Sequence, residues 1–171
     1  MLKLTKKADY SLIALKHFAI RQRETGEAVS AKEVADTCGI PLPLLSKLLQ
    51  KLGKSGFLIS EHGTNGGYRL ARDPALISAL EVIRAIDGPI VLADCFTEHT
   101  SCGHSGRCTV RKPLKRIHEA ILSLLNSVSI SDMVQDDMIQ DSDDHKRLVP
   151  PSLVALQSAP NVLSPVSSLR K

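Results

Sequence analysis

The stretch from residue 30 to residue 71 constrains the fold more than any other part of this chain. Ser30-Ala-Lys-Glu33 has the spacing of a capping box, which predicts a short helix that ends at Gly39. A longer helix begins at Pro43 and runs to about Ser55, with leucines at helical spacing. A short helix, a turn with glycine and a longer helix are typical of a helix-turn-helix. A plain helical hairpin is the alternative.

The residues directly after this helix pair predict a β-hairpin. Residues 57–61 form the first predicted strand, and Tyr68-Arg-Leu-Ala71 forms the second. The turn between them, His62-Gly-Thr-Asn-Gly-Gly67, is rich in residues that accept positive φ. A purely structural hairpin is possible, but a hairpin after a basic helix pair is typical of the wing of a DNA-binding winged helix.

Side chains off the leucine face of the longer helix are cationic or hydrogen-bonding, as a helix in the major groove requires. We expect Ser46 and Gln50 to contact base edges and the lysines to fix the register on phosphates. Asn65 and Arg69 of the wing are candidates for the minor groove or a flanking phosphate. The predicted DNA-contacting residues are Ser46, Lys47, Gln50, Lys51, Lys54, Asn65 and Arg69.

Charge and composition narrow the class of protein. Residues 1–72 hold twelve Lys and Arg against six Asp and Glu, whereas the remaining residues hold ten against twelve. A positive first half suits a polyanionic partner, although chance asymmetry on a solvated surface is the alternative. Aromatic residues make up only 3% of the chain and Trp is absent, which favours a mainly helical core of aliphatic residues.

The sequence holds no apolar run near the roughly 18 residues that a membrane span needs. Its first residues also lack the apolar region of a secretory signal. We therefore expect a cytoplasmic protein that makes no use of a membrane, in a compartment where disulfides are rare.

Further helices are predicted before and after this region. A first helix runs from a cap at Thr5 to about Arg23 and ends near Gly26. Ala8, Leu12, Leu15 and Ala19 form its apolar face, with Ile13 beside them. Ser78-Ala-Leu-Glu81 is a second capping box, and the helix that it begins buries Leu80, Val82, Ile83 and Ile86.

A long helix is predicted from residue 109 to residue 128, followed by a short helix from Ser131. Its apolar residues are spaced 4, 3, 4, 3, 4, which is a coiled-coil-like seam. They are Val110, Leu114, Ile117, Ile121, Leu124 and Val128. Packing on its own domain is the alternative, but we expect this helix to pair with its copy in a homodimer.

The predicted organisation has three parts. Residues 1–72 are a winged helix-turn-helix domain. Residues 73–140 hold a linker helix, a cysteine segment at 95–108 and the dimerisation helix. Residues 141–171, rich in Pro and Ser, are an extension expected to be disordered.

The cysteine segment, residues 95–108, holds three of the four cysteines with the spacing C-x6-C-x5-C. It has only one large apolar side chain, Phe96, so it buries too little apolar surface to order itself. Thiolates are preferred ligands of zinc and of iron–sulfur clusters, so we expect Cys95, Cys102 and Cys108 to hold a metal centre. Cys38, beside apolar neighbours at the end of a short helix, is expected to be a core residue.

Other uses of these cysteines are possible from spacing alone. The alternative roles are a disulfide with one spare thiol, three cysteines without a function, a structural zinc site, or a thiol redox switch. A cysteine nucleophile assisted by His99 or His104 is the enzymatic alternative. We expect no enzyme, because the segment has no candidate oxyanion site.

In this order the helix pair, wing, cysteine segment and long helix resemble the Rrf2 family of bacterial regulators over roughly residues 1–138. The resemblance rests on residues 4–10, on Leu44 to Gly56, on Gly63 to Leu70, on the three cysteines and on residues 124–134. It implies a homodimeric winged-helix repressor or activator, with a repressor as the expected form, and a [2Fe–2S] or [4Fe–4S] cluster on the cysteines.

The chain departs from the family pattern at the fourth cluster ligand. IscR-like members have a histidine three residues past the third cysteine, where this chain has Arg111. NsrR-like members use an aspartate of the first helix from the other subunit, and Asp9 matches that place, although a helix first-turn acid is its alternative role. Local substitutes are Glu98, His99 and His104.

The resemblance also bears on target choice and signal. IscR-like members carry an acidic residue where Ser46 stands, so this chain is expected to discriminate less between target sites. It implies a cluster-sensing regulator of SUF- or ISC-type cluster-assembly genes, which binds a palindromic operator. A nitric-oxide-responsive or redox-responsive regulator of the same family is the alternative.

Overall fold

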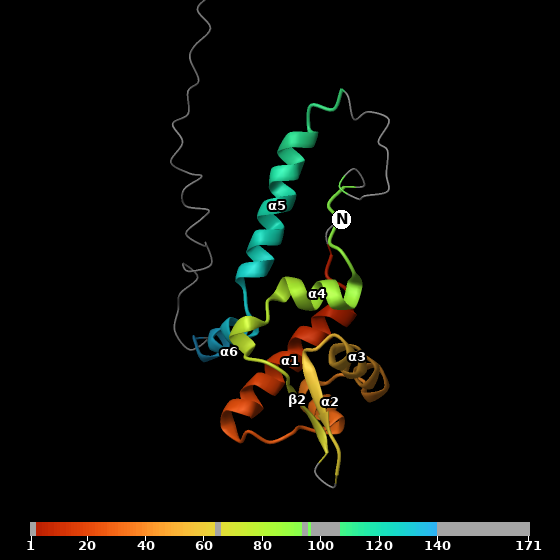
Figure 1. Cartoon of the computed structure of the whole chain (residues 1–171), viewed down its shortest axis with the longest axis vertical. Coiled ribbons are helices and arrows are strands. Elements are labelled where there is room, and N and C mark those ends of the chain that lie inside the picture. The colour runs from red at the N-terminus through yellow and green to blue at the C-terminus, as the bar shows by residue number, and fades with distance from the viewer. Residues whose placement is uncertain (1–2, 64–65, 94–95, 97–106, 140–171) are drawn as a thin grey trace, which may run out of the picture. The chain divides into compact units, whose positions relative to one another are not determined.

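The computed structural model describes residues 3–63, 66–93, 96 and 107–139, and the statements that follow concern these residues. Cys95, Cys102, Asn65 and the predicted extension at 141–171 lie outside them. The elements are α1 Lys6–Glu24, α2 Ala31–Cys38, α3 Leu42–Lys54, β1 Leu58–Glu61, β2 Gly67–Leu70, the short 3-10 helix η1 Pro74–Leu76, α4 Ala79–Asp87, α5 Arg111–Ser127 and α6 Ile130–Ile139 (Figure 1). The prediction of a mainly helical fold with one small hairpin is confirmed.

The first helix begins where its cap predicts. Thr5 Oγ1 accepts a hydrogen bond from the Ala8 N–H at 3.2 Å, which satisfies one of the free amides of the first turn. The buried face of α1 is wider than predicted and consists of Ala8, Ser11, Ala14, Leu15, Phe18 and Ala19. Ile13, which was predicted to lie beside this face, is 36% exposed.

The helix pair α2 and α3 forms as the capping and leucine patterns predict. Ser30 Oγ accepts from the Glu33 N–H at 3.1 Å, and Gly39, with φ 65°, ends α2 in the left-handed conformation. The Glu33 carboxylate lies 3.2 Å from Arg21 Nε of α1, so this acid pairs across the helix interface. Four leucines of α3 are fully buried, namely Leu45, Leu48, Leu49 and Leu52.

The hairpin is an antiparallel pair in which Leu58 lies opposite Leu70 and Glu61 opposite Gly67. It has an additional neighbour that the sequence does not predict. Val29 and Tyr68 exchange two backbone hydrogen bonds of 2.9 Å, so Val29, two residues before α2, lies against the outer edge of β2. A Cβ atom at Gly67 would collide with the Val29 carbonyl, and this close approach therefore requires glycine.

Helix α4 packs against α1 and α3 and completes the core. Its capping box is confirmed, because Glu81 N–H donates to Ser78 Oγ at 3.2 Å and the Ser78 N–H donates to Glu81 Oε2 at 3.3 Å. The four residues predicted to be buried on α4 are all at most 6% exposed.

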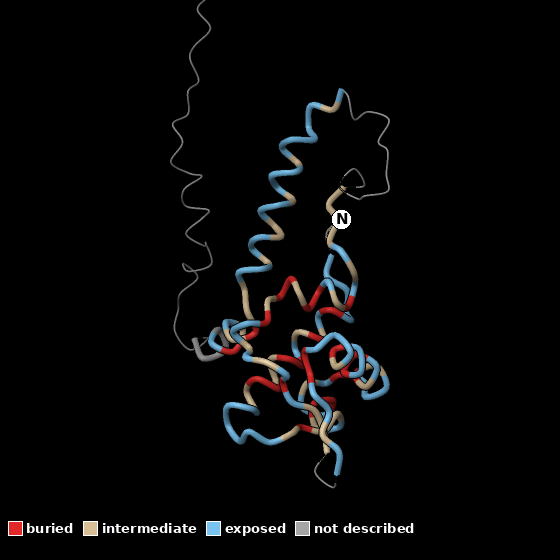
Figure 2. Tube along the Cα trace, viewed as in Figure 1, coloured by how far each residue is buried: buried red, intermediate tan, exposed pale blue. Residues whose placement is uncertain are grey.

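The chain returns to this core after α5. Residues 77–79 bond to residues 128–130 through Ala79 N–H to Val128 O (2.8 Å) and Ile130 N–H to Ile77 O (2.9 Å). In Figure 2 the buried positions gather in the remaining helices and the hairpin, whereas α5 carries only exposed and half-buried positions. None of the described helices is long and apolar enough to cross a membrane.

Candidate nucleic-acid interface and cysteine site

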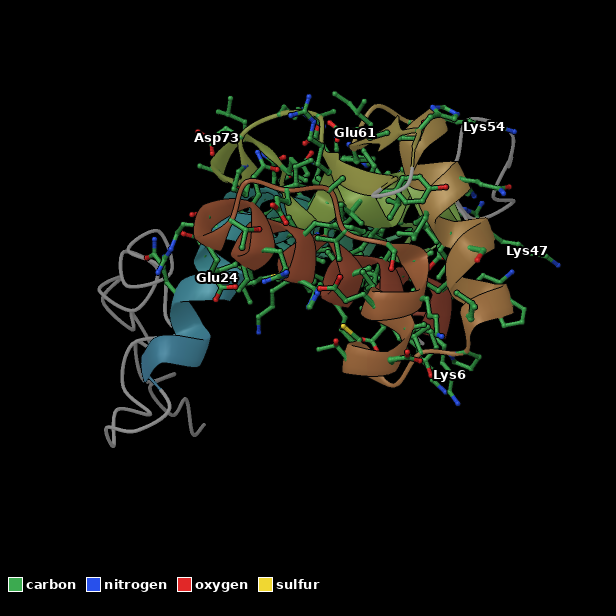
Figure 3. All side chains as sticks on the ribbon, turned by 90° about the horizontal axis from the view of Figure 1, so that it is seen from below. Lys6, Glu24, Lys47, Lys54, Glu61 and Asp73 are labelled. Atoms are coloured by element: carbon green, nitrogen blue, oxygen red, sulfur yellow. The ribbon has the colours of Figure 1, made fainter. Side chains whose placement is uncertain are left out.

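The outer face of α3 carries the side chains that the sequence assigns to DNA. Lys47, Gln50 and Lys54 are exposed, and their spacing of three and four residues places them on one face of the helix. Lys47 and Lys54 extend away from the body of the protein (Figure 3). Ser46 is half-buried one residue before Lys47. This face offers two cations for phosphates and an amide that suits the edge of adenine.

Lys51 has a different environment from the other lysines of α3. Its Nζ donates a hydrogen bond of 2.8 Å to the Ile86 carbonyl in the last turn of α4. The structure therefore brings Lys47, Gln50 and Lys54 together and directs the Lys51 ammonium to a neighbouring helix.

Arg69 of the wing is paired within the wing. Its Nε lies 2.7 Å from Glu61 Oε1, and both side chains are partly exposed. Ion pairs of this kind contribute about 0–1 kcal/mol, so a phosphate competes readily for the guanidinium. At the base of the hairpin, Arg72 covers the Phe57 ring at 5.2 Å and pairs with Glu81 at 3.2 Å. Arg72 therefore links the base of the wing to Glu81 of α4.

Of the cysteine segment, the structure describes Phe96 near its beginning and residues 107 and 108 at its end. Cys108 is half-buried and forms no disulfide with any described cysteine. It lies three residues before α5, whose first turn holds Arg111 and Lys112 and no acid. Glu98, His99 and His104 lie outside the described residues with Cys95 and Cys102. Within the described residues, no three His, Cys, Asp or Glu side chains lie close enough to hold a metal ion.

The beginning of the cysteine segment contacts α5 through an aromatic pair that sequence reasoning missed. The Phe96 ring stacks on His118 with centroids 5.2 Å apart and an angle of 20° between the rings. The Phe96 N–H also donates to the Ala93 carbonyl at 2.9 Å. His118 Nδ1 is buried and has no hydrogen-bond partner among the described residues. The stack thus fixes the residue beside Cys95 on the middle of α5.

The other two candidate residues lie apart from this pair. Asp9 is exposed in the first turn of α1, where a carboxylate interacts favourably with the helix dipole. Cys38 packs against the core, and burial raises the pKa of its thiol. The prediction that Cys38 is a packing residue is confirmed.

Residues 4–136 match the Rrf2 family, which is described as an iron-dependent transcriptional regulator. The chain belongs to the Rrf2 family. It is therefore a DNA-binding transcriptional regulator, as its relatives are named.

Two relatives show the extent of the similarity within the Rrf2 family. The HTH-type transcriptional regulator NsrR of Bacillus licheniformis is 34% identical over 136 residues, which are 79% of this chain and 94% of that protein. The HTH-type transcriptional regulator IscR of Xenorhabdus nematophila is 30% identical over 153 residues, which are 87% and 92% of the two chains.

Solved structures share the fold. CymR, the global cysteine regulator of B. subtilis, superposes with a TM-score of 0.65 and 26% identity over 84% of this chain and all of that one. IscR of T. potens gives a TM-score of 0.63 and 26% identity over 84% and 93% of the two chains. The predicted winged helix-turn-helix is confirmed by these neighbours.

Proposed function

We propose that this Rrf2-family regulator is a homodimer that holds an iron–sulfur cluster in its cysteine segment and binds a palindromic operator according to the state of that cluster. One observation carries the proposal. Helix α5 begins three residues after Cys108 and buries none of its own residues, and three residues of the predicted apolar seam are strongly exposed. These are Val110 (55%), Ile117 (50%) and Leu124 (41%). A second copy of α5 would cover them.

The DNA-binding surface follows from a two-fold dimer. Two copies of α3 enter successive major grooves about 34 Å apart, or a multiple of that distance. Lys47 and Lys54 contact phosphates, and Ser46 and Gln50 contact base edges. In the wing, Asn65 and Arg69 contact the minor groove or a flanking phosphate once Arg69 leaves Glu61.

The donor chemistry of the cysteine site fits a cluster. Three thiols suit iron–sulfur ligation. Cys108 forms no disulfide with a described cysteine, and it lies before α5, whose first turn is cationic. Cys95, Cys102 and Cys108 would be the ligands, with Asp9 of the partner subunit as the fourth, since Asp9 is exposed. When bound, the cluster would supply a centre whose gain, loss or oxidation changes how residues 95–108 are held.

A second function within the family is a thiol-based, nitric-oxide or redox response without a resident cluster, or a structural zinc. Two observations favour it. CymR, the global cysteine regulator of B. subtilis, shares the fold with a TM-score of 0.65, and Arg111 stands where IscR-like members have a histidine. SUF- or ISC-type genes are the proposed targets only under the first function.

Purification without oxygen separates the two functions. Under the first, the protein is coloured, contains iron and acid-labile sulfide, and loses both colour and iron on treatment with a chelator. Under the second it is colourless, because zinc and thiols do not absorb visible light. The variant Cys108→Ser should lose the colour, whereas Cys38→Ser should keep it because Cys38 packs against the core of the helix-turn-helix. A coloured Cys108→Ser protein with full iron content would contradict the ligand assignment.

A further inference from the structure

Lys51 is an exposed residue of the recognition helix, as Lys47 and Lys54 are, yet its ammonium is bonded to another helix. The Nζ to Ile86 O distance is 2.8 Å, and the Ile86 side chain is only 6% exposed. Lys47 and Lys54, one turn away on either side, extend outward instead (Figure 3).

The bond has a physical reason at the end of α4. The last four carbonyls of a helix have no partner within the helix, and a cation near them is favoured by the helix dipole. Gly88 N–H satisfies the Arg84 carbonyl at 3.0 Å. The Ile86 carbonyl is satisfied by Lys51, which therefore caps α4 from another element.

Asp87, the residue after Ile86, is hydrogen-bonded to the start of α1. Thr5 Oγ1, at the start of α1, lies 2.8 Å from each carboxylate oxygen of Asp87 and donates to this carboxylate. Helices α1 and α3 both pack on α4 as well. The last turn of α4 is thus hydrogen-bonded to the start of the first helix and to the recognition helix.

This same turn leads into the cysteine segment. Gly88, with φ 87°, takes the chain out of α4, and Cys95 follows Ile86 by nine residues. Phe96 then contacts His118 of α5. A displacement of the segment before Cys95 acts first on the residues to which Lys51 and Thr5 are bonded.

We propose that Lys51 is a positioning residue, which holds the recognition helix to the end of α4 and does not contact a phosphate. Through this bond the placement of α3 follows the chain that enters the cysteine segment. The second statement rests on the proposed function, whereas the first does not.

The salt dependence of DNA binding tests the first statement. The DNA is a duplex selected by the wild-type protein from a random library. Each phosphate contact contributes about 0.9 to the slope of log Kobs against log salt concentration. Lys51→Met should keep the wild-type slope, whereas Lys47→Met and Lys54→Met should each give a slope shallower by about 0.9 per bound subunit, which is about 1.8 for a dimer. A Lys51→Met slope that is shallower by that amount overturns the proposal.

Amide hydrogen exchange of the DNA-free protein provides a readout that a phosphate contact would not move. Lys51→Met should speed exchange in the last turn of α4 and at Gly88. Lys51→Arg, which keeps a charged donor, should restore the slow exchange, and Lys54→Met should leave it unchanged. Equal exchange rates in Lys51→Met and in the wild-type protein would show that Lys51 does not hold α3 to the end of α4.

The ratio of affinities for the selected duplex, before and after removal of iron, tests the second statement. Lys51→Met should bring the wild-type ratio to within about twofold of one, while Lys54→Met weakens both forms equally and keeps the ratio. A wild-type ratio retained in Lys51→Met overturns this statement. A wild-type protein that contains no iron, or whose affinity for the duplex does not change when iron is removed, instead contradicts the proposed function. The salt slopes and the exchange rates still test the first statement in that case.

Discussion

At the scale of single residues, two glycines on either side of β1 have opposite requirements. Gly67 is fixed by its neighbour, because a Cβ atom there would collide with the Val29 carbonyl. Gly53, in the last turn of α3, has room, since a Cβ atom would lie 3.7 Å from the Leu58 carbonyl. The contact between β2 and Val29 therefore requires that residue 67 has no Cβ atom.

Replacing Gly67 by alanine should lower the free energy of unfolding by about 1–3 kcal/mol, since the backbones of β2 and residue 29 must separate. The matched variant Gly53→Ala should be neutral or raise it by up to about 1 kcal/mol, because alanine favours helix. Urea denaturation of both variants measures the difference. Equal stability of the two would show that the Val29 contact is dispensable.

A second residue-scale prediction concerns His17, which lies on α1. Burial lowers its pKa below the ordinary value of 6.5, against the opposing charge of Glu33. The neutral form is therefore favoured in the folded state, and its stabilising contribution is complete above about pH 6.5. That contribution is lost as the pH falls through 6.5 toward the lowered pKa of the folded state.

The melting temperature of the wild type should accordingly fall between pH 7.5 and pH 5.5. His17→Gln, which cannot titrate, should show a smaller fall over the same range. Thermal melts in matched buffers, followed by circular dichroism, measure both. A fall of the same size in the variant would place the pH dependence on other groups.

At the scale of elements, helices with local signals were predictable and contacts between distant elements were not. Capping pairs such as Ser78 with Glu81, and the leucine spacing of α3, depend on residues within one turn, so the sequence reveals them. The hydrogen bonds of Lys51 with Ile86 and of Val29 with Tyr68 join residues that are neighbours only after packing. Helical spacing alone therefore assigns all three α3 lysines to phosphates, because the hydrogen-bond partner of Lys51 lies on another element.

The stack between Phe96 and His118 is another contact of this kind, and it makes a prediction about the cysteine segment. Aromatic pairs contribute about 0.5–1.5 kcal/mol beyond buried area, which corresponds to about two- to thirteenfold in the population of the stacked state. If the protein holds the proposed cluster, His118→Ala should therefore lose its visible absorbance in air about two- to thirteenfold faster than the wild type.

His118→Phe keeps an aromatic ring at this position and is the matched control. It should lose absorbance at close to the wild-type rate. If His118→Phe decays as fast as His118→Ala, the imidazole acts by its nitrogen atoms and the stack is not what stabilises the segment. Far-UV circular dichroism of both variants should match the wild type.

At the scale of the whole molecule, α5 is the element that one chain does not complete. Its exposed seam residues recur at a spacing of seven, so a charge at two of them should prevent pairing. Ile117→Glu combined with Leu124→Glu should shift the mass measured by light scattering from that of a dimer to that of a single chain. Operator affinity should fall by at least about tenfold, since only one recognition helix can then bind.

Ile59→Glu is the control for this prediction. Ile59 is 45% exposed on the wing, outside α5, so it tests the effect of a charge at an exposed apolar position. This variant should remain a dimer. A double variant in α5 that remains dimeric would show that another surface joins the subunits.

The pairing of residues 77–79 with residues 128–130 has a mechanical consequence. Hydrogen bonds between these two segments hold the C-terminal end of α5. A rearrangement near Cys108, at the other end, would therefore turn the helix about the end that is held. In this way a small change of shape at one end would become a change in the angle between two protomers.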